Sequence, residues 1–279
     1  MSRPLGGYIG YDAEPATTAA PGIWTLREAE FYQRKAQWPV PFAPDVLTGL
    51  QAWYDASDAS TLYDATTGGS LVAADGSVAR WEDKSGNDYH MTQGTAGSRP
   101  ARKTAIQGGL DVLRFDGSDD ALLNSTFNQN GQAGTTVFGV VKTVSQTSVL
   151  IGTYKLSIPA NGWLANVGNS TATYGVTFEG RIDNSGGSYR SAARSLTGSD
   201  DFVVFSGKYD GSEQIAYQNG TAGTADTAPS GNIVQTAARL AVGQVNAAND
   251  GGSNAFYEMD LGEIIIYNSA LSDTDREAV

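Results

Sequence analysis

Asp-Gly and Asn-Gly dipeptides recur at short intervals after Leu47, and they separate runs of residues that favour strands. Both dipeptides accept the positive φ angles that tight hairpins require. No amphipathic helix lies between the runs, whereas parallel sheets need crossover helices. The pattern therefore predicts an all-β fold, a two-sheet antiparallel sandwich, over residues 47–279. The dipeptides lie at 75–76, 116–117, 130–131, 161–162, 210–211 and 219–220, and the expected strands are 50–54, 78–83, 112–116, 135–141, 148–151, 174–179, 201–209, 214–218, 239–243 and 256–267.

Residues 1–46 have a different character, because they hold six of the nine prolines. A capping box at Thr25–Glu28 predicts one short helix over Leu26–Ala36, which Trp38-Pro39 ends. This arm of forty-odd residues, extended outside the helix, is too short to bury its aromatic side chains as a domain of its own. We expect these side chains to dock on another protein, although the sandwich itself could also cover them. They are Tyr8, Tyr11, Trp24, Phe31, Tyr32 and Trp38.

The last residues predict a second short helix, because Ser272-Asp273-Thr274-Asp275 places a cap and acidic side chains at a helix start. Only about a turn and a half of chain remains after this cap. A helix of that length is not stable alone, so we expect it to pack on the sandwich.

Charge and composition exclude several classes of function. The net charge of −12 argues against DNA, RNA and anionic membranes, which attract Lys and Arg clusters. The sequence contains no run of about 18 apolar residues, the length needed to cross a membrane, and no secretory signal is visible. The absence of Cys excludes disulfides and thiol catalysis. The single histidine, His90, excludes a multi-histidine metal site, and we expect it to be solvated in a polar turn.

Several short motifs follow one another along the sandwich region. In this order they resemble the concanavalin A-like (laminin G-like, LamG) domains of bacterial and phage surface proteins. The resemblance implies a jelly-roll sandwich of the lectin type. The motifs are Ala52-Trp53-Tyr54-Asp55-Ala56-Ser57-Asp58, Trp81-Glu82-Asp83-Lys84-Ser85-Gly86-Asn87, Arg99-Pro100, Phe115-Asp116-Gly117-Ser118-Asp119-Asp120, Tyr217-Gln218-Asn219-Gly220 and the run from Gly262 to Ser272.

The arm carries a second resemblance. Gly6-Gly7-Tyr8-Ile9-Gly10, Gly22-Ile23-Trp24-Thr25-Leu26 and Trp38-Pro39 resemble the start of structural proteins from tailed bacteriophages. In those proteins such a segment precedes a variable fibre or lectin-like body. A fold does not fix a function, so this inference is one of analogy.

Three carboxylates lie close together at Asp116, Asp119 and Asp120. Oxygen-rich loops of this kind can hold Ca²⁺, which takes six to eight oxygen ligands. We therefore regard Ca²⁺ as the one cofactor to test. The alternative is a plain turn in which Phe115 enters the core and the carboxylates face water.

Glu258, Asp260 and Glu263 match the pattern E-x-D-x-x-E, which is similar to the catalytic strand of laminarinase-type glycoside hydrolases. On an unbroken strand Glu263 would face away from the other two, and a bulge near Gly262 would bring it to their side. The alternative is an ordinary final strand with Glu258 and Asp260 facing solvent. We expect no enzymatic activity and keep hydrolysis as the alternative function.

Aromatic rings can stack on the apolar faces of sugars. Trp163 follows an Asn-Gly turn and Tyr189 lies in a Gly- and Ser-rich loop, so these two are the predicted sugar contacts. Trp53 and Trp81 lie in strand-like runs, and we expect both in the core.

The two resemblances together imply a virion structural protein of a bacteriophage, such as a fibre, spike or capsid-decoration protein. The arm would anchor it to other virion proteins, and the sandwich would bind host-surface glycans or cover the particle. We expect a homo-oligomer, with a trimer as our assignment, located in the virion and assembled in the host cytoplasm. A purely structural role without any ligand is a third alternative.

Overall fold

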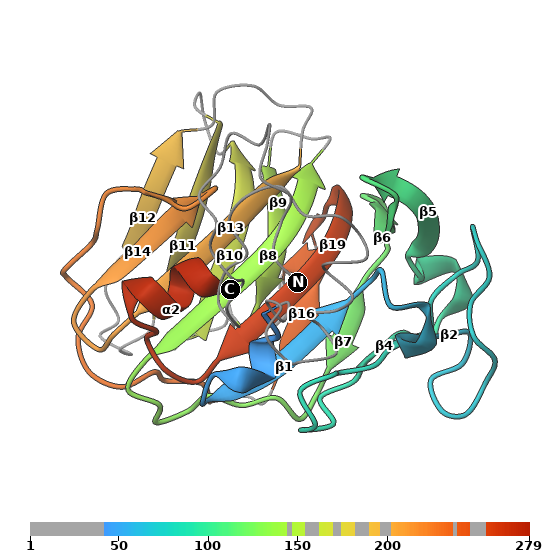
Figure 1. Cartoon of the computed structure of the whole chain (residues 1–279), viewed down its shortest axis with the longest axis horizontal. Coiled ribbons are helices and arrows are strands. Elements are labelled where there is room, and N and C mark those ends of the chain that lie inside the picture. The colour runs from blue at the N-terminus through green and yellow to red at the C-terminus, as the bar shows by residue number, and fades with distance from the viewer. Residues whose placement is uncertain are drawn as a thin grey trace, which may run out of the picture. The chain divides into compact units, whose positions relative to one another are not determined.

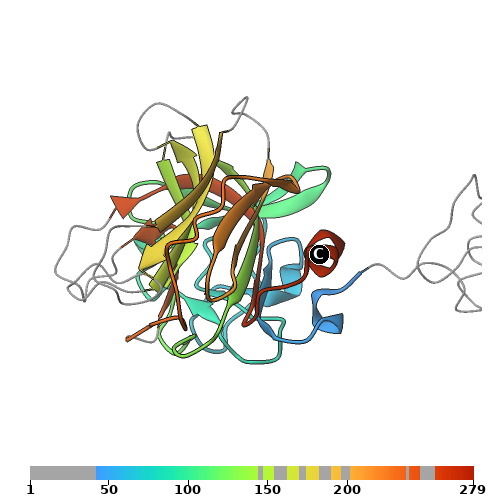
Figure 2. The ribbon, with the colours of Figure 1, turned by 90° about the vertical axis from the view of Figure 1, so that its left-hand side faces the viewer.

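The computed structural model describes residues 42–143, 147–153, 162–169, 174–181, 190–195, 202–236, 239–245 and 255–279. The chain divides into two compact units, one formed by Leu47–Ala278 and the other by Met1–Val46 with Val279. The first unit is a β-sandwich in which two large sheets face each other (Figures 1 and 2). The helical segments are short: η1 (Pro44–Val46), η2 (Ala59–Thr61), η3 (Ala96–Ser98) and α2 (Asp273–Ala278).

The first sheet has eight strands in the order β15-β14-β13-β8-β19-β6-β5, and β1 pairs beside β19. Their bounds are β15 (Thr221–Ala222), β14 (Gln214–Gln218), β13 (Val203–Tyr209), β8 (Thr135–Thr143), β19 (Glu258–Tyr267), β6 (Leu110–Asp116), β5 (Ala101–Gln107) and β1 (Leu50–Asp55).

The second sheet has nine strands in the order β12-β11-β10-β9-β16-β7-β4-β3-β2. Their bounds are β12 (Arg190–Ser195), β11 (Tyr174–Arg181), β10 (Gly162–Asn169), β9 (Thr147–Gly152), β16 (Leu240–Val242), β7 (Leu122–Asn124), β4 (Met91–Thr92), β3 (Arg80–Trp81) and β2 (Leu62–Tyr63). A separate pair joins β17 (Gln244–Val245) to β18 (Ala255–Phe256).

Every strand pair among the described residues is antiparallel, which confirms the predicted two-sheet antiparallel sandwich. The Asn219-Gly220 turn between β14 and β15 has positive φ at both residues, as its sequence predicts. Eight strands lie outside the predicted ranges: the two- and three-residue strands β2, β4, β7, β15 and β17, and the longer strands β5, β10 and β12. Their sequences lack a strong apolar alternation, so pairing with neighbours rather than local pattern makes them strands.

The core lies between the two sheets and is built from large side chains of both. The fully buried members include Trp81, Trp163, Phe115, Phe178 and Phe205. Each such side chain contributes roughly 1.5–3 kcal/mol by leaving water. The two sheets approach each other closely at Gly207 of β13, which packs against the Phe178 ring of β11. A side chain at position 207 would not fit, since its Cβ would stand 2.5 Å from that ring.

A buried glutamine joins the two sheets by hydrogen bonds. The Trp163 Nε1 of β10 donates to Gln129 Oε1 over 2.7 Å, and Gln129 Nε2 donates to Gln51 Oε1 over 2.7 Å and to Thr135 Oγ1 over 3.1 Å. Gln51 and Thr135 lie on β1 and β8 of the other sheet. Because buried polar groups must be paired, this network fixes how the sheets stack.

The predicted C-terminal helix is present as α2. Ser272 Oγ accepts a hydrogen bond from the Asp275 N–H over 3.1 Å, which is the expected cap. The helix packs on the sandwich through Arg276, whose guanidinium lies 3.8 Å from the centre of the Tyr217 ring. Within the described part of the chain, no helix combines the length and apolar character that crossing a membrane requires.

Candidate functional site

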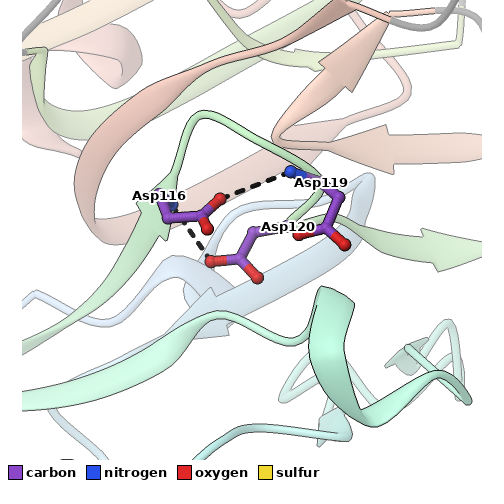
Figure 3. Close-up of side chains that lie close together, drawn as sticks. All are labelled: Asp116, Asp119 and Asp120. Atoms are coloured by element: carbon purple, nitrogen blue, oxygen red, sulfur yellow. Dashed lines mark hydrogen bonds between the residues drawn. The ribbon is translucent and has the colours of Figure 1, made fainter.

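The three predicted metal ligands come together in the turn between β6 and β7 (Figure 3). Asp116 ends β6, and one carboxylate oxygen from each of Asp116, Asp119 and Asp120 lies within 4.8 Å of the others. Asp116 and Asp119 are exposed, whereas Asp120 is buried. The structure therefore brings together the carboxylates that the sequence predicts.

Local hydrogen bonds hold this turn in shape. Asp120 Oδ2 accepts from the Asp116 N–H over 3.0 Å, and Asp116 Oδ1 accepts from the Ser118 N–H over 2.8 Å. Ser98 Oγ donates to Asp119 Oδ2 over 3.0 Å. Gly117 has a φ of +74°, and a Cβ there would lie 2.9 Å from the backbone nitrogen of Glu258, so the turn presses against β19. These bonds give the carboxylates a structural role of their own.

The negative charges of Asp116 and Asp119 act on the carboxyl group of Asp120. Burial raises the pKa of Asp120 to about 6, and the negative charges of Asp116 and Asp119 add to the rise, while the hydrogen bond from the Asp116 N–H opposes it. A divalent cation would relieve this repulsion. The three carboxylates are the hard oxygen ligands that Ca²⁺ prefers, and they would supply three of its six to eight ligands.

Calcium binding at this turn can be measured through thermal stability. A cation that binds only the folded chain at 100 times its Kd adds about 2.7 kcal/mol, which is worth several degrees of Tm. Binding predicts a rise in Tm with CaCl₂ that the Asp120→Asn variant lacks. If the Tm in CaCl₂ equals the Tm in buffer from which EDTA has removed divalent cations, the cluster is only a turn.

Asp120→Asn should stabilise the protein above pH 6. Because the folded-state pKa is raised above the usual 3.8, the ionised form of Asp120 destabilises the fold. Stability from this group is complete below the unfolded pKa and is lost as pH rises through about 6. Exposed neighbours reduce the effect to about 1–2 kcal/mol.

The measurement is urea unfolding of both proteins at pH 4.5, 6 and 8. The wild-type protein should lose stability relative to Asp120→Asn across this range. Asp45→Asn removes the same charge from an exposed side chain outside the turn and is the matched control. Parallel pH profiles for the wild type and Asp120→Asn would contradict the assignment.

A second polar cluster joins two of the motifs that carry the resemblance, Ala52–Asp58 and Trp81–Asn87. The buried carboxylate of Asp83 accepts four hydrogen bonds: Oδ1 from the Trp53 N–H and the Ser85 N–H, each over 2.9 Å, and Oδ2 from Ser85 Oγ over 2.8 Å and the Tyr89 N–H over 3.1 Å. These bonds attach residues 83–89 to strand β1. These motif residues therefore have a structural role, because their hydrogen bonds hold the loop against the strand.

His90 belongs to the same cluster. Its Nδ1 accepts a hydrogen bond from the Asp83 N–H over 3.0 Å. The expectation of a simply solvated histidine is therefore wrong, because this ring satisfies a backbone donor beside the Asp83 carboxylate.

Trp53 lies outside the core, so the prediction that places it inside is wrong, while Trp81 is fully buried as predicted. The indole Nε1 of Trp53 donates to Glu263 Oε1 over 2.8 Å, and Lys84 Nζ lies 4.4 Å from the ring centre. Lys84 also forms ion pairs of 2.9 Å with Asp55 and Asp58. The sequence did not predict that these charged side chains come together, although every one of them lies in one of the quoted motifs.

The final strand contains the bulge that the E-x-D-x-x-E pattern requires. The register of β19 against β8 shifts between Leu261 and Glu263. Met259 and Leu261 face the core, and so do Ile264 and Ile266, which leaves Glu263 on the outer face with Asp260. The bulge therefore places all three acidic residues on one side of the sheet.

Two of the three acidic residues, Asp260 and Glu263, bind different side chains. Asp260 forms a two-pronged ion pair with Arg114 at 2.6 and 2.7 Å, and Glu263 accepts from Trp53. Burial raises the pKa of Glu263, although the bond from Trp53 opposes the rise. Glu258 is exposed.

Of the predicted sugar contacts, Trp163 is fully buried and its ring packs 5.8 Å from that of Phe178. The expectation of an exposed Trp163 is therefore wrong, because Gln129 draws its indole N–H into the core. Tyr189 lies outside the described residues, and so do Tyr8, Tyr11, Trp24, Phe31, Tyr32 and Trp38 of the arm.

No family model and no curated protein matches the chain. Solved structures do match. A structure titled receptor binding domain of botulinum neurotoxin D has 11% identity and a TM-score of 0.56 over 84% of this chain and 52% of its own. Trypanosoma rangeli sialidase in complex with sialic acid has 12% identity and a TM-score of 0.50 over 88% of this chain and 34% of its own.

A further complex of Trypanosoma rangeli sialidase, with 2,3-difluorosialic acid as covalent intermediate, has 11% identity and a TM-score of 0.54 over 86% of this chain and 33% of its own. The chain thus spans about a third of the sialidase and half of the toxin domain. At this identity the similarity concerns the fold alone. That fold is an antiparallel β-sandwich of two sheets.

Proposed function

We propose that this protein is a structural component of a tailed-bacteriophage particle that displays a lectin-like sandwich. Residues 1–46 anchor it to other virion proteins, and the sandwich binds glycans on the host surface or decorates the capsid or tail. The observation that carries the proposal is a lectin-type sandwich, Leu47–Ala278, preceded in the sequence by a separate unit rich in prolines and aromatic residues.

Glycan binding is supported by the fold, since similar sandwiches occur in a toxin's receptor binding domain and in a sialidase solved with sialic acid. We propose binding rather than catalysis, because Asp260 and Glu263 are each engaged by another side chain. A glycan array that includes sialylated oligosaccharides tests this point with the full-length protein. Specific hits support a lectin, whereas an array without hits favours a purely structural role.

Anchoring is tested by replacing Trp24, Phe31 and Tyr32 together with Ala in the full-length chain. The variant should fold as the wild type does but no longer enter particles, and it should lose any trimeric state that depends on the arm. Val204→Ala, which truncates an exposed apolar side chain of the sandwich, is the control and should be incorporated normally. Normal incorporation of the triple variant would remove the anchoring proposal.

The bulge at Gly262 favours one second candidate, a laminarinase-type glycoside hydrolase that uses Glu258, Asp260 and Glu263. Retaining hydrolysis needs two carboxyl groups about 5–5.5 Å apart. Five residue steps of about 3.3 Å place the backbones of Glu258 and Glu263 up to roughly 16 Å apart, so their side chains would have to lean toward each other.

Hydrolysis is tested by the release of reducing sugar from a panel of β-glucans. An enzyme would lose this activity in Glu258→Gln and in Glu263→Gln while its stability stayed near that of the wild type. Glu277→Gln, an exposed residue of α2, is the control. No release from any polysaccharide of the panel would exclude this candidate.

A further inference from the structure

We draw no further inference here: the strongest candidate, the carboxylate cluster of Asp116, Asp119 and Asp120 in the turn between β6 and β7, belongs to the candidate site already described, and no second observation among the described residues points to a ligand there.

Discussion

Asp83→Ala should destabilise the sandwich by about 3–5 kcal/mol, a large part of the stability of a typical domain. The substitution removes an acceptor of four hydrogen bonds and leaves the N–H groups of Trp53, Ser85 and Tyr89 without this partner. Hydrogen bonds to a charged group contribute about 1.5–3 kcal/mol each, but the four act as a unit and their contributions do not add.

Urea unfolding followed by tryptophan fluorescence measures this effect. Asp83→Asn is the informative second variant, because it keeps one acceptor oxygen but turns an amide N–H₂ toward the donors. We expect it to fold and to recover only part of the loss. Glu258→Ala removes the same charge from an exposed side chain of β19 and should change stability by less than about 0.5 kcal/mol. A loss for Asp83→Ala no greater than that of Glu258→Ala would contradict the structural role of the motif.

Gln129→Leu should be similarly costly, at about 3–5 kcal/mol, because it leaves the Trp163 Nε1 and the Gln51 Oε1 buried without this partner. The glutamine is fully buried, so water cannot replace it without opening the core. The same measurement applies, and the midpoint of unfolding should fall with little change of slope.

A double-mutant cycle separates the hydrogen bond from packing. Trp163→Phe removes the indole N–H while keeping an aromatic ring between the sheets. If the Trp163–Gln129 bond carries the cost, the double variant should be at least about 1 kcal/mol more stable than the sum of the single losses predicts. Additive losses would show that the two residues contribute independently. Thr177→Ala, on the neighbouring strand β11, is a control outside this network.

The class of fold could be predicted because its signals are local. Asn219 and Gly220 both take the positive φ that their tight hairpin requires. Ser272 caps α2 by accepting a hydrogen bond from Asp275, only three residues later. The same holds for the acidic turn, since Asp116, Asp119 and Asp120 are near neighbours in sequence. The sequence did not predict strands β10 and β12, because their own residues lack a strong alternation of apolar and polar side chains. Both become strands by pairing with β11.

The faces and partners of single side chains needed the tertiary structure. Trp163 follows a turn, where exposure is the reasonable expectation, yet Gln129 holds it in the core from 34 residues away. Trp53 has a strand-like sequence context, yet it lies outside the core against Glu263, which is 210 residues distant. Glu263 faces outward only because β19 bulges against β8.

By itself, then, the sequence determined where the chain turns, that its strands form an antiparallel sandwich, and that three carboxylates share one turn. Only the tertiary structure decided which face of each strand meets the opposite sheet and which distant side chain satisfies each buried polar group. The physical reason is that turns and caps depend on residues a few positions apart. Burial and pairing depend on the register between strands that lie far apart in the chain, and a single bulge reverses the face of the residues that follow it.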